Sequence, residues 1–358
     1  MVAMKYVWLI LLLGVIGIAG CGAAIQQDTN NVEGGIETNV DNKGIGVGSG
    51  SDTNTQDRLG DQRLVPISDT IQTTSDGTKY IVDPSKIRGG GPPKDGIPSI
   101  DNPKYVTVDA ADEWIEDNEL VLALSYKGAK RVYPLQIMVF HEIVNDNVAG
   151  DPILITYCPL CGSGIAFERI INNEEVEFGT SGKLFNSNLV MYDRKTDTYW
   201  TQIGGQAIIG ELTGMKLEPV SIDTVTWRDW KAAHPDSEVL SQNTGFFRDY
   251  GRDPYGNYYE DSFLIFPVDN EDDRIHPKTV IYGIEVDGVY KAYEEDDVIN
   301  AGGELIDAVS GVNVKVERDS AGLVKITNTD TGEEIVKERD FWFAWYAFHP
   351  NTGLYESG

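Results

Sequence analysis

The stretch Asp151–Phe167, DPILITYCPLCGSGIAF, places two cysteines between two apolar runs rich in β-branched residues. Such runs predict β-strands, and the residues between them predict a tight turn. Gly162 and Gly164 follow the cysteines directly and disfavour the helix that a C-x-x-C motif opens in thioredoxin-type proteins. We therefore expect a hairpin knuckle that aims Cys158 and Cys161 at one point, like half of a rubredoxin or zinc-ribbon site.

Outward from this stretch, the chain repeats itself. Residues 121–133 (VLALSYKGAKRVY) resemble residues 281–293 (IYGIEVDGVYKAY), and a Trp-x-x-Trp-x-x-x-His-Pro frame occurs at Trp227 and again at Trp342. Fixed-order similarity of this kind indicates a duplicated structural unit. The sequence predicts a β-rich α+β fold made of a tandem duplicated β-sheet unit with short helices, with about 45 extra residues in the first copy.

Local patterns in the first copy predict its opening elements. Residues 119–126 and 130–133 are typical of two strands around the Lys127-Gly128 turn. Pro134 is compatible with the start of a short helical turn that ends near Met138.

The N-terminus predicts export and lipid attachment. Lys5 precedes an apolar run from Tyr6 to Ala19, which has the length of a signal-peptide core and ends just before Cys21. Small residues before this cysteine resemble the lipobox of secreted lipoproteins, so residues 1–21 are read as a signal peptide ending at lipidated Cys21. The alternative, an uncleaved anchor helix, gives the same location: extracytoplasmic, at the cell membrane.

Composition divides the rest of the chain. Polar, aromatic-poor residues predict a disordered tether over residues 22–84. We expect a first repeat unit at 85–245, a connecting strap at 246–277 and a second repeat unit at 278–358.

Charge and motifs exclude some ligands. The formal net charge is -28, which argues against nucleic acid or an anionic membrane surface as the partner. Residues 179–188 contain Gly-Lys but lack the spacing of a phosphate-binding loop, so no nucleotide cofactor is expected.

The main functional hypothesis is a soft transition-metal site. With Cys21 assigned to the lipid, Cys158 and Cys161 are the two remaining cysteines, and thiolates select copper or zinc. His141 is the expected third ligand because its position in the second copy is occupied by Gly302. We expect copper ahead of zinc, for metal handling or electron transfer, with a metal-delivery or redox protein as the partner. Residues expected around the cleft are Glu142, Ser181, Asn186, Asn188, Met191, Arg248 and Arg252.

Two other functions stay open. Cys158 and Cys161 are also compatible with a thiol-disulfide oxidoreductase, in which they would be the catalytic pair. Alternatively, the chain is a surface interaction protein in which the pair is a structural disulfide. The sequence does not decide whether the protein is an enzyme.

Several motifs together resemble a known family. These are HEIVND at 141–146, TYCPLCG at 156–162, residues 178–200, TWRDWKAAHPDSEVLS at 226–241, RDYGRDPY at 248–255 and residues 341–355. In this order they are similar to the uncharacterised family called domain of unknown function 3179, over about Val121 to Tyr355. The resemblance implies a prokaryotic, exported or lipid-anchored protein and no particular reaction or ligand.

Overall fold

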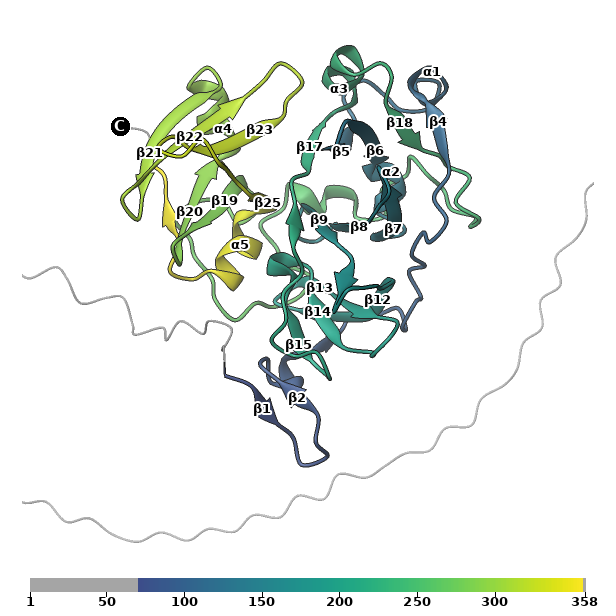
Figure 1. Cartoon of the computed structure of the whole chain (residues 1–358), viewed down its shortest axis with the longest axis vertical. Coiled ribbons are helices and arrows are strands. Elements are labelled where there is room, and N and C mark those ends of the chain that lie inside the picture. Colours follow the sequence, from purple (N-terminus) through teal and green to yellow (C-terminus); the bar gives the residue numbers. More distant parts are fainter. Residues whose placement is uncertain (1–69, 357–358) are drawn as a thin grey trace, which may run out of the picture. The chain divides into compact units, whose positions relative to one another are not determined.

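The computed structural model describes residues 70–356, which form a β-rich α+β fold with short helices (Figure 1). The predicted signal peptide, Cys21 and the tether up to residue 69 lie outside the described residues. Within residues 70–356, no helix has the length and apolar character needed to cross a membrane.

The strands form small, mostly antiparallel sheets. The first unit contains a five-stranded sheet and a four-stranded sheet. In sheet order, the five strands are β17 (Asp223–Thr226), β5 (Leu120–Tyr126), β6 (Ala129–Pro134), β18 (Glu238–Leu240) and β4 (Tyr105–Thr107). The four are β16 (Pro219–Val220), β9 (Ser163–Glu168), β8 (Asp151–Cys158) and β7 (Ile143–Val148). Strands β5 and β6 and the helix α2 (Leu135–Met138) confirm the predicted opening of this unit.

The second unit has two four-stranded sheets. One contains β25 (Lys337–Phe341), β19 (Val280–Val286), β20 (Val289–Glu294) and β26 (Gly353–Leu354). The other contains β21 (Glu304–Val309), β22 (Val312–Arg318), β23 (Val324–Asn328) and β24 (Glu334–Ile335). The remaining helices of the two units are α1 (Val108–Ala111), α3 (Trp227–Ala233), α4 (Glu295–Asn300) and α5 (Trp342–Phe348).

Strand pairing repeats between the two units. In the first, β5 pairs antiparallel with β6 and β17, and β18 runs parallel to β6. In the second, β19 pairs antiparallel with β20 and β25, and β26 runs parallel to β20. The predicted duplication of the β-sheet unit is therefore confirmed.

The Trp-x-x-Trp frame is the packing centre of each unit. Trp230 Nε1 donates to Ser237 Oγ at 2.9 Å, and Trp345 Nε1 donates to Thr352 Oγ1 at 2.9 Å. His234 packs against Trp230 and His349 against Trp345, each in a tilted arrangement with ring centroids 4.2 Å apart. The two histidines therefore pack against the core in equivalent places.

The first unit is longer than the second, and its extra residues include four strands of a seven-stranded sheet. The other three strands of this sheet precede the first unit's five-stranded sheet in sequence. In order, the seven-stranded sheet contains β1 (Gln72–Thr73), β2 (Lys79–Tyr80), β15 (Ala207–Ile209), β14 (Tyr199–Thr201), β13 (Asn188–Asp193), β12 (Phe178–Phe185) and β3 (Arg88–Gly89). The other short elements are β10 (Ile170–Ile171), β11 (Glu174–Glu175), η1 (Pro84–Lys86), η2 (Ile203–Gly205) and η3 (Gly256–Tyr259). One buried cluster includes Cys158, Cys161, Met191 and side chains of α5 from the second unit.

The expected boundary of the tether at residue 84 is corrected by this sheet. Strands β1 and β2 lie within the range expected to be disordered, and β2 pairs with β15 through Tyr80 and Ile209. Ile81 and Val82 are buried in the same cluster as the cysteines. The average composition of residues 22–84 is polar and predicts disorder, but these few apolar residues bury enough surface to order the end of the range.

Candidate functional site

The knuckle is a turn between β8 and β9. Cys158 is the last residue of β8 and pairs in register with Ser163, the first residue of β9. Cys161 N donates to Cys158 O at 3.1 Å, and Gly162 adopts a left-handed φ of 62°. An added Cβ at Gly162 would lie 2.8 Å from the Phe341 ring, so glycine is required both by the turn and by the packing.

The two sulfurs are close, unbridged and buried. Their Sγ atoms are 3.2 Å apart, and the residues are 2% and 0% exposed for Cys158 and Cys161. Asn188 Nδ2 donates to Cys161 Sγ at 3.4 Å, and Ser187 O lies 3.5 Å from the same sulfur. The site is therefore a shielded dithiol with polar neighbours on the Cys161 side.

The two thiols differ in acidity. Burial opposes ionisation of Cys158, but hydrogen bonds from the Cys161 thiol and from the backbone N–H groups of Leu189, Cys161 and Leu160 outweigh it and lower the pKa of Cys158. Burial, the hydrogen bond to Cys158 and the negative charge of that sulfur raise the pKa of Cys161 well above its ordinary value. The arrangement favours one thiolate, on Cys158, and one thiol, on Cys161.

A buried amide network holds Asn188 in place. Gln202 Oε1 accepts from Asn188 Nδ2 at 2.7 Å and from Ser163 Oγ at 2.8 Å. Gln202 Nε2 donates to Ser163 O at 3.1 Å and Thr156 Oγ1 at 3.2 Å. Because these partners are satisfied, the network fixes the donor to Cys161.

Two buried carboxyl groups, Glu142 and Asp340, lie near the dithiol, and the partly buried Glu338 lies near Asp340. Burial and the charge of Cys158 raise the pKa of Glu142 well above its ordinary value, and this residue has a left-handed φ of 58°. Burial, Glu338 and Cys158 raise the pKa of Asp340 in the same way. Burial raises the pKa of Glu338 to about 7. Both carboxylate oxygens of Asp340 and Oε2 of Glu338 are buried without a hydrogen-bond partner.

His141 lies against the connecting strap. Its Nδ1 is 2.7 Å from Pro98 O and its Nε2 is 2.6 Å from Tyr250 Oη, so both ring nitrogens are engaged. The ring also packs on Phe246 and Tyr250. Among residues 70–356, no group of three or more His, Cys, Asp or Glu side chains is arranged to hold a metal ion. The structure thus brings the two cysteines together without bringing His141 to them.

The other residues expected around the cleft are divided. Glu142 and Asn188 lie at the dithiol, and Met191 is buried in the same core cluster. Ser181, in β12, donates to Val190 O of the neighbouring strand β13, and Asn186 bonds the backbone of Ala347 and Asp269. Arg248 bonds Phe247 O, and Arg252 is 84% exposed in the strap beside Asp249. The last four side chains have structural or surface roles.

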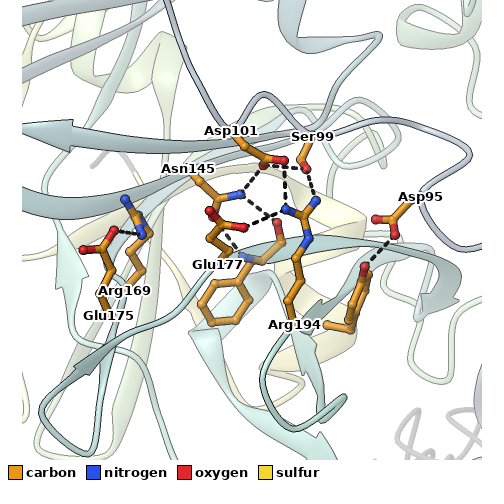
Figure 2. Close-up of polar contacts among 10 residues, drawn as sticks. Asp95, Ser99, Asp101, Asn145, Arg169, Glu175, Glu177 and Arg194 are labelled. Carbon is orange, nitrogen blue, oxygen red and sulfur yellow. Dashed lines mark hydrogen bonds and ion pairs between the residues drawn. The ribbon is translucent and has the colours of Figure 1, made fainter.

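A second polar cluster surrounds Arg194 (Figure 2). Arg194 donates to Asp101 at 2.8 Å, to Glu177 at 2.9 Å and to Ser99 Oγ at 2.8 Å. Asn145 donates to Asp101 and to Phe178 O, both at 2.8 Å. These groups satisfy one another and fasten residues 99–101 to the sheets, so we assign the cluster a structural role.

The model of the family described as "Protein of unknown function (DUF3179)" matches residues 94–352. The chain belongs to the DUF3179 family. The match confirms the resemblance found in the sequence and contains every residue of the dithiol site. No curated protein and no solved structure matches the chain.

Sequence reasoning missed the residues that the second unit adds to this DUF3179 site. Asp340 follows Val225 by the same 115 positions that separate the two Trp-x-x-Trp frames. A buried carboxylate at a position that is apolar in the other copy was the available signal. This difference between the copies does not place Asp340 at the dithiol, because the sequence does not tell which strand of the second unit packs against the knuckle of the first.

Proposed function

We propose that Cys158 and Cys161 form a redox-active dithiol that exchanges two electrons with a disulfide substrate. The observation that carries the proposal is the pair of sulfurs 3.2 Å apart with opposite pKa shifts. A nucleophilic thiolate beside a protonated resolving thiol is the arrangement that thiol-disulfide exchange uses.

The exchange balances with a disulfide RS–SR as oxidant. The Cys158 thiolate attacks one sulfur of RS–SR, forms the Cys158–S–SR mixed disulfide and releases RS⁻, which takes a proton. Cys161 then loses its proton and attacks Cys158 Sγ, which closes the protein disulfide and releases the second thiol. Because both sulfurs are buried, the substrate is expected to be a small disulfide. A disulfide-bearing partner protein would reach the sulfurs only if the connecting strap moved away.

The test is redox equilibration of the domain starting near Leu64. The protein is held at set ratios of reduced to oxidised dithiothreitol, and free thiols are counted by alkylation and mass spectrometry. We expect one cooperative two-electron transition, absent in Cys158→Ser and Cys161→Ser. Failure of wild type to form the disulfide at any ratio would refute the proposal.

A soft-metal site is the second candidate. Backbone N–H donors around Cys158 are also what a metal-bound thiolate in a knuckle requires, and two thiolates suit Cu(I) ahead of zinc. Anaerobic competition with a Cu(I) chelator is expected to give one copper per reduced chain and none per oxidised chain. Because its nitrogens are engaged elsewhere, His141→Ala should leave the affinity unchanged. Equal copper uptake by Cys158→Ser would contradict this candidate.

We further propose that the protein is tethered outside the cell membrane through a lipid on Cys21. The support is the apolar run and the small residues before this cysteine. Mass spectrometry of the N-terminal peptide should find a diacylglyceryl group on Cys21, and an unmodified thiol there would contradict the anchor.

A further inference from the structure

Strand β25 of the second unit runs beside the knuckle of the first. Phe341 N donates to Cys161 O at 2.8 Å, and the carboxyl group of the neighbouring residue, Asp340, lies near enough to interact with the charges of Cys158 and Cys161. Glu338 lies two residues earlier, on the same face of the strand as Asp340. The fold thus aligns two carboxyl groups on one strand face: the buried Asp340 beside the dithiol and the partly buried Glu338 farther from Cys161.

The second of these carboxyl groups, Glu338, lines a cavity of about 190 Å³ together with Lys216 and His349. Glu338 Oε1 accepts from Gly204 N at 3.1 Å, whereas its Oε2 has no partner. An unpartnered buried carboxylate oxygen is expensive unless it carries or exchanges a proton.

We infer that Asp340 first gives up its own proton to the cavity through Glu338 and then accepts the proton of Cys161 when the disulfide closes. The inference rests on the proposed dithiol function. In the mixed disulfide Cys158 no longer carries a negative charge, so Asp340 can release its own proton through Glu338. Ionised Asp340 then takes the proton of Cys161, whose sulfur attacks Cys158 Sγ and expels RS⁻.

Other charged groups lie around this path. Arg339 lies between Glu338 and Asp340 in sequence, so its side chain is on the opposite face of the strand, where its guanidinium pairs with Glu295 at 3.1 Å. Lys216 lies at the cavity end, and Glu142 lies beside Cys158 at the other end. Glu142 therefore offers a matched control: it is a buried carboxyl group that neighbours the attacking sulfur.

The experiment separates the two steps with 5,5′-dithiobis(2-nitrobenzoate) as the disulfide. Release of the first coloured thiol reports attack by Cys158, and release of the second reports closure by Cys161. In Asp340→Asn we expect an unchanged first phase and a second phase slowed about 100-fold at pH 7, a usual contribution of a positioned base. The rate of that second phase should recover as pH rises toward ionisation of Cys161.

Glu142→Gln should leave the second phase at the wild-type rate. Equal second phases in wild type and Asp340→Asn, or equal slowing in Glu142→Gln, would overturn the inference. If Asp340→Asn does not fold, Glu338→Gln takes its place, and a slower second phase is expected. An unchanged second phase in Glu338→Gln would overturn the proton path through Glu338. If wild type itself releases no second thiol, the proposed function fails instead.

Discussion

Trp345→Ala is expected to lower the free energy of unfolding by about 3–5 kcal/mol, the usual range for removing a buried aromatic ring. Trp345 is 2% exposed and its ring occupies the space above Gly283, where an added Cβ would lie 2.5 Å away. The substitution also removes the donor to Thr352 Oγ1. Urea denaturation followed by circular dichroism measures the change.

The duplication provides the control for this substitution. Trp230 is 0% exposed and donates to Ser237 Oγ in the first unit, so Trp230→Ala should cost about the same. Phenylalanine at either position should cost less, because the ring volume is mostly kept. If Trp345→Ala cost less than about 1 kcal/mol while Trp230→Ala cost about 3–5, the two frames would not be equivalent packing centres.

Tyr258→Ala is expected to speed alkylation of the dithiol by about 100-fold. Tyr258 belongs to the strap, is 7% exposed and donates from Oη to Leu160 O at 3.0 Å, directly over the knuckle. Loss of this bond and of the packed ring should make local opening easier by about 3 kcal/mol, and each 1.4 kcal/mol is a factor of ten. The measurement is the rate of thiol alkylation by iodoacetamide under native conditions.

Two further variants separate the causes. Tyr258→Phe keeps the ring over the knuckle and should raise the rate only a few fold, as expected for one hydrogen bond. Tyr259 bonds Asp253 at 3.0 Å rather than the knuckle, so Tyr259→Phe should leave the rate unchanged. Alkylation of Tyr258→Ala at the wild-type rate would show that the strap does not control access.

Local sequence patterns predicted the hairpin, the repeat and the β-rich class because these depend on neighbouring residues. Cys158 and Cys161 lie three positions apart, so turn chemistry alone brings their sulfurs together. The contribution of Asp340 was hidden, because it depends on β25 packing against β9 across more than 170 positions of sequence. His141 was proposed as a ligand because the second copy has no histidine at the corresponding position. That difference between the copies does not tell where the side chain of His141 points.

The hydrogen bond from Phe341 N to Cys161 O has a consequence for synthesis. In a chain made from its N-terminus onward, the two cysteines emerge long before the residue that closes over them. Any folding intermediate that lacks β25 leaves this carbonyl without its donor and lets reagents reach the sulfurs. A thiol-blocking reagent added during biogenesis would therefore react faster with unfinished chains than with finished ones, so that the rate of cysteine labelling records when the last strands arrive.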